Sequence, residues 1–178
     1  MHQRDLRIRR MLEELKERMY IHREPVAGLE ISPRGENAFK PFENGALWGG
    51  EGEWWDFRVH AQVPASFTGA VLLAATTGYE SGWEAVNPQF VVKQDGKIIQ
   101  ALDTRHTTCL LMGKAVPGAR IELELNAYAA DVKQPPRLYL ELCDRDDEVM
   151  GLVYDISVPW EAVKLMPEHE RERETTLF

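Results

Sequence analysis

Residues 89–102, QFVVKQDGKIIQAL, decide the fold that we expect for this chain. Two short segments with strand character, 89–93 and 97–102, flank the pair Asp95-Gly96. An Asp-Gly pair in this position is the strongest short-range signal for a two-residue hairpin turn, because both turn positions need a positive φ. The stretch therefore predicts two antiparallel strands joined by a tight turn.

Further segments with strand character lie on both sides of this hairpin. Phe57, Val59, Ala61 and Val63 alternate with polar residues, which is the pattern of a strand with one buried face. The remaining segments are an apolar run at 70–75 and apolar or alternating runs at 108–112, 121–127 and 138–142. Many short strands separated by turn residues are typical of a sandwich or barrel. We predict a mainly β chain in which residues 25–145 form a β-sandwich of about eight strands.

An amphipathic helix is predicted at the N-terminus, within residues 1–24. Its apolar positions follow helical spacing in a run rich in Arg, Glu, Lys and Leu: Ile8, Leu12, Leu15 and Met19. Pro25 and Gly28 are expected to end it. Residues 24–53 contain several prolines and glycines without clear periodicity, and we expect them to form loop with room for short strands.

A second amphipathic helix is predicted within residues 146–178, as a linker that leads toward a domain absent from this chain. Acidic residues at 144–148, directly after Cys143, suit the positive end of a helix dipole. Apolar residues then recur at helical spacing: Val149, Leu152, Val153, Ile156, Trp160 and Val163. Pro159 lacks a backbone donor and should kink or divide the helix near Val158. A strand over residues 152–158 is the rival interpretation.

Composition bounds the class of protein. The 178 residues are 44% hydrophobic and 28% charged, which is ordinary for a folded domain. The net charge of −8 provides no basic field for nucleic acid or an anionic membrane, so neither is expected as a partner. We find no apolar segment long enough to span a membrane and no signal-peptide pattern at the start, and we therefore expect a cytoplasmic location. Cys109 and Cys143 lack metal or redox spacing and are expected to be reduced core thiols.

The sequence contains none of the short motifs that mark hydrolase or zinc chemistry, such as His-any-Asp, HExxH or GxSxG. We therefore predict no catalytic residue and no metal ligand in this chain. Asp103, Arg105 and His106 follow the hairpin and could grip a sugar hydroxyl or a carboxylate. Such a trio more often forms a turn with local side-chain to backbone hydrogen bonds. His60 is expected to be an outward-facing polar residue of its strand.

The chain has five tryptophans, Trp48, Trp54, Trp55, Trp83 and Trp160. Neighbouring residues of a strand face opposite sides, so Trp54, out of phase with Phe57, should point outward. An exposed tryptophan can be a platform for a sugar ring or an anchor for a neighbouring domain. We favour docking. Trp48 is grouped with Trp54, Asp103, Arg105 and His106 as candidates for carbohydrate or interdomain contact.

Four stretches of the chain resemble the N-terminal region of the cytosolic and bacterial type of α-mannosidase in glycoside hydrolase family 38. They are RIRRMLEELKERMYIHREP (7–25), LWGGEGEWWDFRVHAQVP (47–64), GWEAVNPQFVVKQDGKIIQALDTRHTTCLL (82–111) and VYDISVPWEAVKLMPE (153–168). The most specific part is NPQFVVKQDGKIIQALDTRH, residues 87–106. Members of the family carry a similar hairpin with an Asp-Gly turn, followed by Leu-Asp and then a basic residue and histidine.

The resemblance implies a galactose-binding-like (jelly-roll) β-sandwich that precedes a zinc-dependent catalytic domain. That enzyme releases mannose from α-mannosides with retention, through an aspartate nucleophile. The zinc and the nucleophile are expected in the absent catalytic domain, and no residue of this chain is assigned to either. The implied partners are that catalytic domain and, in the parent enzyme, a second subunit. Two alternatives stay open: a carbohydrate-binding module with its own affinity for mannosides, and a free-standing adaptor β-sandwich.

Overall fold

A computed structural model describes residues 2–78, 80, 88–130 and 134–167. The chain divides into two compact units, and we describe each by itself. One unit is His22–Asp144, which contains the β-structure, and the other combines Met1–Ile21 with Arg145–Phe178. Trp83 and residues 168–178 lie outside the described part of the chain.

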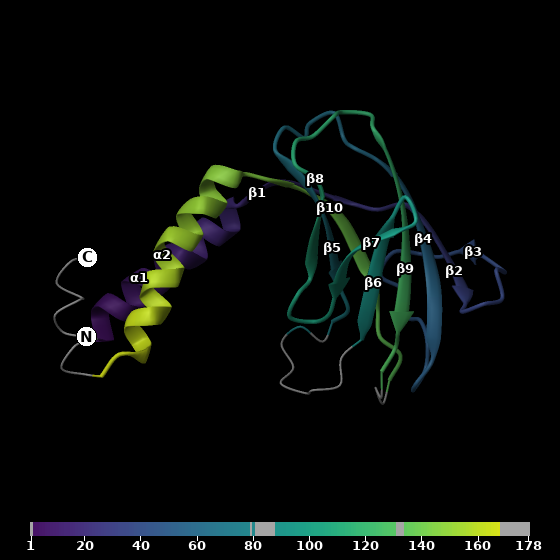
Figure 1. The fold of residues 1–178 in the computed structure, drawn as a ribbon, viewed down its shortest axis with the longest axis horizontal. Helices are drawn as coiled ribbons and strands as arrows, with labels where there is room; N and C mark the ends of the chain where they lie inside the picture. Colours follow the sequence, from purple (N-terminus) through teal and green to yellow (C-terminus); the bar gives the residue numbers. More distant parts are fainter. Residues whose placement is uncertain (1, 79, 81–87, 131–133, 168–178) are drawn as a thin grey trace. The chain divides into compact units, whose positions relative to one another are not determined.

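The β-unit is a sandwich of two sheets (Figure 1). The larger sheet has six strands, and all five of its strand pairings are antiparallel. In spatial order its strands are β3 (Lys40–Pro41), β2 (Gly28–Pro33), β4 (Trp54–Gln62), β9 (Arg120–Tyr128), β6 (Gln89–Gln94) and β7 (Lys97–Leu102). The smaller sheet contains, in order, β1 (Tyr20–Pro25), β10 (Tyr139–Arg145), β5 (Ala70–Thr76) and β8 (Thr108–Met112). The predicted β-sandwich is therefore confirmed.

The hairpin from which the fold was predicted is present as β6 and β7. Gln94 pairs with Lys97 across a two-residue turn. Asp95 and Gly96 have φ values of +52° and +73°, the conformation that an Asp-Gly hairpin turn requires. The register shifts once, between Val92 and Lys93.

One hydrophobic core fills the space between the two sheets. Phe57 and Val59 of β4 and Leu125 of β9 come from the six-stranded sheet, and Val71 and Leu73 come from β5 of the other. The side chains of all five are fully buried. They occupy alternate positions of their strands, because successive side chains of a strand point to opposite faces.

Each of the seven predicted strand segments corresponds to one of β4–β10. The structure adds three strands. β2 and β3 lie within residues 24–53, where we expected loop with room for short strands, whereas β1 lies mostly within residues 1–24, where we expected helix. These strands end at Pro25, Pro33 and Pro41. The exposure of β1 and β3 does not alternate, and in β2 the alternation covers only residues 28–31, so the period-two signal in this region is short. The N-terminal helix is correspondingly shorter than expected. It ends at Arg18, and β1 begins at Tyr20.

The second unit contains two helices that contact each other, α1 (His2–Arg18) and α2 (Asp147–Leu165). They run in opposite directions (Figure 1). The backbone N–H of Asp146 donates to the carbonyl of Met19 over 2.9 Å and so ties the end of α1 to the start of α2. Within the described residues, no helix is both long and apolar enough to cross a membrane.

The acidic run at 144–148 divides between a strand and a helix. Asp146 is the N-cap of α2, and its side chain accepts hydrogen bonds from the backbone N–H groups of Glu148 and Val149. The helix then continues through Pro159 as one element of 19 residues. The expected division near Val158 and the rival strand at 152–158 are therefore wrong. Asp144, the first residue of the acidic run, belongs to β10, within the range 25–145 expected for the sandwich.

Asp144 is a buried carboxylate that closes a turn of the sandwich. Its side chain is fully buried, and its two oxygens accept hydrogen bonds from the backbone N–H groups of Thr68 (3.0 Å) and Gly69 (2.7 Å). The turn that precedes β5 therefore obtains hydrogen-bond acceptors from a strand about 75 residues further along the chain.

We expect Asp144→Ala to lower the free energy of unfolding of the sandwich by about 2–4 kcal/mol, because two N–H groups lose a charged acceptor in a buried place. Urea unfolding followed by tryptophan fluorescence measures the change. The matched control is Glu51→Ala, which removes an exposed carboxylate from a turn and should change the value by less than about 0.5 kcal/mol. Equal effects of the two substitutions would contradict this role of Asp144.

Candidate binding surface on the six-stranded sheet

The outer face of the six-stranded sheet carries the most distinctive polar and aromatic side chains of the sandwich. Strand β4 pairs with β9 over nine positions, from Trp54 opposite Tyr128 to Gln62 opposite Arg120. Every second pair faces away from the core. These outward pairs are Trp54 with Tyr128, Asp56 with Asn126, Arg58 with Glu124, His60 with Glu122, and Gln62 with Arg120.

His60 is held between two carboxylates from the strands on either side of it. Its Nδ1 atom interacts with Oε2 of Glu122 on β9, and its Nε2 atom lies 3.6 Å from Oε2 of Glu30 on β2. About half of the His60 side chain is exposed, which agrees with the outward position predicted for it. The imidazole is therefore fixed in orientation while solvent still reaches it.

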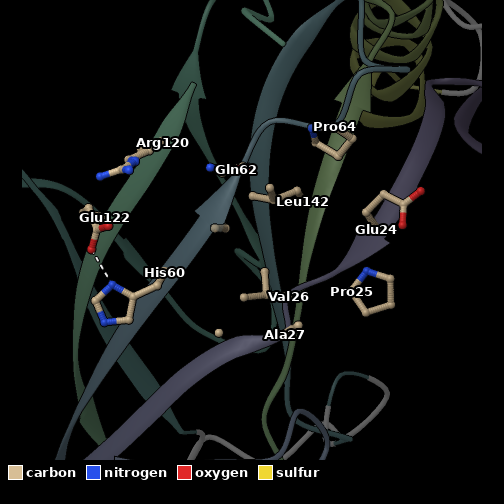
Figure 2. Close-up of a pocket in the computed structure, with 12 residues that line it drawn as sticks. Glu24, Pro25, Val26, Ala27, His60, Gln62, Pro64, Arg120, Glu122 and Leu142 are labelled. Atoms are coloured by element: carbon tan, nitrogen blue, oxygen red, sulfur yellow. Dashed lines mark hydrogen bonds and ion pairs between the residues drawn. The ribbon is translucent and has the colours of Figure 1, made fainter. Parts of the chain in front are cut away.

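A groove of about 730 Å³ opens beside His60 (Figure 2). Its polar side is formed by His60, Gln62, Arg120 and Glu122, and its apolar side includes Val26 and Leu142. A second, smaller groove of about 300 Å³ is lined by His60 and Glu122 and also by Arg58, Lys93 and the Asp95-Gly96 turn. The His60–Glu122 pair therefore borders both grooves. Groups of this kind can hydrogen-bond the hydroxyls of a polar ligand.

Trp54 lies at the opposite end of the same face, and its indole contacts side chains from two neighbouring parts of the chain. It is 47% exposed, as its phase relative to Phe57 predicted. The guanidinium carbon of Arg34 lies 4.7 Å from the centre of the ring. The ring of Tyr128 is stacked on it at 4.7 Å with a 31° tilt. The two groups come from opposite neighbours of β4, because Tyr128 belongs to β9 and Arg34 directly follows β2, and together they cover part of the indole surface.

Trp48 is a core residue, contrary to its selection as a surface candidate. Its side chain is only 3% exposed. It packs edge-on against Phe57 at 5.3 Å and tilted against Phe90 at 5.6 Å. Among the described residues, its Nε1–H finds no hydrogen-bond acceptor. Trp48 comes from a loop rather than a strand, so no alternation was available to predict which way its ring points.

The Asp103, Arg105 and His106 trio forms the turn that connects β7 to β8. One carboxylate oxygen of Asp103 accepts from the backbone N–H groups of Arg105 (2.8 Å) and His106 (2.7 Å) and lies 3.1 Å from Nδ1 of His106. Burial by itself would raise the pKa of the Asp103 carboxyl. The hydrogen bonds together lower that pKa by more than burial raises it, so the pKa of Asp103 is below its usual value. This is the local turn that the sequence favoured. A role in gripping a ligand stays a prediction.

The structure places Trp54 and the Asp103 turn at the same end of the sheet without bringing them into contact. Leu102 lies in one cross-strand row with Phe90, Ala127 and Trp55. Asp103 follows Leu102, and Trp54 precedes Trp55. Because β7 and β4 run in opposite directions, both residues lie at the same end of the sheet. Three strand spacings separate them, which amounts to about 14 Å.

Several residues of this surface were not found from the sequence. The sequence did not single out four residues of this surface, and each belongs to it only because it contacts His60 or Trp54 from another part of the chain. They are Glu30, Glu122, Tyr128 and Arg34. His60 and Glu122 are 62 positions apart and meet because β4 pairs with β9. Alternation predicts which residues face outward, but it does not predict the register that pairs them.

The residues described by the structure contain no group of three or more His, Cys, Asp or Glu side chains arranged to hold a metal ion. They therefore do not fit the zinc centre that the resemblance places in a catalytic domain. No protein-family model matches the chain. No curated protein matches it significantly.

The two cysteines are buried free thiols of the sandwich. Burial raises the pKa of Cys109 to about 11, against a small opposing effect of a backbone hydrogen bond at Leu73. Burial likewise raises the pKa of Cys143 to about 11. Since the thiolate is the reactive form, both the low access and the raised pKa suppress reactivity near neutral pH.

We expect neither thiol to react with Ellman's reagent at pH 8 in the native protein within minutes, because only about one thiol in a thousand is ionised there. Any slow native reaction should accelerate as the pH rises toward 11. The denatured protein in guanidinium serves as the control, in which two thiols per chain should react at once. A native cysteine that reacts at pH 8 as fast as in guanidinium would contradict the burial of these thiols.

Proposed function

We propose that this chain is a non-catalytic β-sandwich accessory region of an α-mannosidase of glycoside hydrolase family 38. In this proposal the sandwich is of the galactose-binding-like type and supports the catalytic domain of the parent enzyme by docking against it. The enzyme class comes from the resemblance. Its most specific stretch, residues 87–106, includes the β6–β7 hairpin and the Asp103 turn.

The observation that carries the docking role is the surface cluster of Trp54, Tyr128 and Arg34, in which Trp54 and Arg34 are exposed and Tyr128 is half-buried. Tryptophan, tyrosine and arginine are the residue types most enriched among the energetically dominant residues of protein interfaces. Because Arg34 and Tyr128 already contact the indole, the ring is rigid and pre-organised. A partner that covers it would bury apolar area with little further loss of side-chain entropy.

The enzyme assignment is tested first by activity. The 178-residue chain, supplied with zinc and an aryl α-mannoside, should release no aryl alcohol above a buffer blank, because the acid, nucleophile and metal ligands are assigned to another domain. An active family-38 α-mannosidase under identical conditions is the positive control. Turnover by the chain alone would refute its non-catalytic assignment, and a coding sequence that stops at Phe178 would refute its place in a longer enzyme.

The docking role is tested with two substitutions of similar exposure on different sheets. Trp54→Ala should weaken binding of the chain to the catalytic domain of its parent enzyme by about tenfold or more in titration calorimetry. Leu110→Ala, on β8 of the four-stranded sheet, removes a side chain that is 49% exposed and should leave binding unchanged. Circular dichroism checks that both variants stay folded. Equal binding by Trp54→Ala and the unsubstituted chain would remove the proposed anchor.

A second candidate function is carbohydrate binding, which the groove beside His60 favours. Its polar side presents His60, Gln62, Arg120 and Glu122 to a space large enough for one or two sugar rings. Trp54 supports this function less well, because a sugar platform needs an open ring face and Arg34 covers one. In this alternative the chain would bind mannosides without cleaving them.

Titration of the folded chain with mannose and mannobiose distinguishes carbohydrate binding from docking against a catalytic domain. Carbohydrate binding requires a saturable heat of binding. His60→Ala should then lower the affinity for the sugar at least tenfold, and Leu110→Ala, the control, should leave the affinity unchanged. Docking alone requires no heat from either sugar while circular dichroism shows an intact β-sandwich. A saturable heat that His60→Ala does not change would exclude the groove as the sugar site.

A further inference from the structure

The pair Asn44-Gly45 lies in the loop between β3 and β4 and is the only Asn-Gly pair in the sequence. The fold requires glycine at the second position of this pair. Gly45 has a φ of +91°, and a Cβ placed on it would lie 2.6 Å from Cε1 of the Tyr139 ring. Only glycine adopts this backbone conformation without strain and fits so close to the ring.

The fold also uses the amide of Asn44, which fastens the loop to β10. Its Nδ2 group donates to the carbonyls of Leu140 (2.7 Å) and Val26 (2.9 Å), and its Oδ1 atom accepts from the backbone N–H of Leu140 (2.9 Å). Both Leu140 and Val26 are buried. Asparagine has donors and an acceptor on one short side chain, whereas an ionised aspartate has acceptors alone. Aspartate therefore could not replace the amide nitrogen in this position.

Asparagine followed by glycine is a chemically labile pair, because glycine has no side chain to hinder attack by its own backbone nitrogen. In this reaction the backbone nitrogen of Gly45 attacks Cγ of Asn44. A new C–N bond forms, the bond from Cγ to Nδ2 breaks, and the proton of the Gly45 nitrogen leaves with the departing ammonia. Water then opens the resulting succinimide ring at either carbonyl, which gives aspartate or isoaspartate. One water is consumed and one ammonia is released, without any oxidant or reductant.

The native sandwich holds both reacting groups in place. Three hydrogen bonds fix the amide of Asn44 against Leu140 and Val26. The N–H of Gly45 donates to the carbonyl of Leu138 over 2.7 Å, so the nitrogen that would attack is also engaged. Closing the succinimide ring would break these bonds, and it therefore needs a local opening of the loop.

We infer that Asn44 is a site of spontaneous deamidation that the native sandwich suppresses, and that deamidation in the unfolded chain prevents the chain from refolding. Aspartate in place of Asn44 would turn an oxygen toward the carbonyls of Val26 and Leu140, which repels them and removes a donor. Isoaspartate adds a carbon to the main chain and displaces Gly45 from its place beside Tyr139. The time spent unfolded then limits how much protein returns to the native state. None of these steps depends on which enzyme the chain serves.

Peptide mapping by mass spectrometry tests the suppression, with the full chain kept in mildly alkaline buffer, native in one sample and unfolded in guanidinium in the other. Asn44 should gain the mass of deamidation at least about tenfold more slowly in the native sample. Asn126, which is followed by alanine, is the internal control and should react more slowly than Asn44 in guanidinium. Equal rates at Asn44 in the two samples would overturn the inference, as would a rate in guanidinium no faster than at Asn126.

Dilution of the aged guanidinium sample tests the effect on refolding. Size-exclusion chromatography separates chains that regain the native size from those that do not. Deamidated Asn44 should be enriched at least about tenfold in the chains that do not refold. Isomerisation at Asp95-Gly96 leaves the mass unchanged and is therefore not counted. Equal deamidation of Asn44 in the two fractions would contradict a block on refolding.

Asn44→Asp reproduces the aspartate product without ageing. It should lower the urea midpoint at neutral pH and lower it less in acid, each relative to the unsubstituted chain at the same pH, because a protonated carboxyl regains one donor. Asn37→Asp, the same substitution at an exposed position, is the matched control and should leave both midpoints nearly unchanged. Loss of the folded state of Asn44→Asp at neutral pH would agree with the inference. A neutral midpoint equal to that of the unsubstituted chain would overturn it.

Discussion

The pairing of β4 with β9 is the constraint on which the sandwich depends. It joins nine consecutive residue pairs in one register, from Trp54–Tyr128 to Gln62–Arg120. Because side chains alternate, this register puts Phe57, Val59, Leu123 and Leu125 into the core. A shift by one position would expose those residues and bury the charged ones instead, at a cost far beyond the stability of a domain this size.

The same pairing builds the outer surface. His60 can be held between Glu122 and Glu30 only because β9 and β2 lie on either side of β4. Trp54 is stacked on Tyr128 for the same reason, since the two residues end the ladder opposite each other. The aromatic cluster and the groove thus lie toward the two ends of one nine-residue ladder, about 26 Å long at roughly 3.3 Å per residue. Core and surface are specified together.

The sequence predicted some strands from alternating burial, β5 from its continuous apolar run and β7 from the Asp-Gly turn that precedes it. Arg120–Tyr128 is the clearest example, with buried residues at every second position of most of its length. Phase relative to Phe57 was enough to predict that Trp54 faces outward. Alternation could not predict the direction of the Trp48 side chain, because Trp48 lies in a loop and not in a strand. Its ring is in the core. The Glu122–His60 contact could not be predicted either, because it needs the register between strands some 60 residues apart. Strand order depends on the same non-local pairing.

Strand β7 ends the six-stranded sheet, with Ile98 68% and Ile99 38% exposed along it. An edge strand with exposed apolar side chains is a site at which another chain can add a strand and begin an intermolecular sheet. The irregularity between Val92 and Lys93 interrupts the regular ladder next to that edge, and Lys97 places a charge at its start. An incoming strand would lose hydrogen bonds at the bulge and would have to desolvate an ammonium group. The register shift in the hairpin thereby makes this exposed edge a poorer template for the strand of another chain.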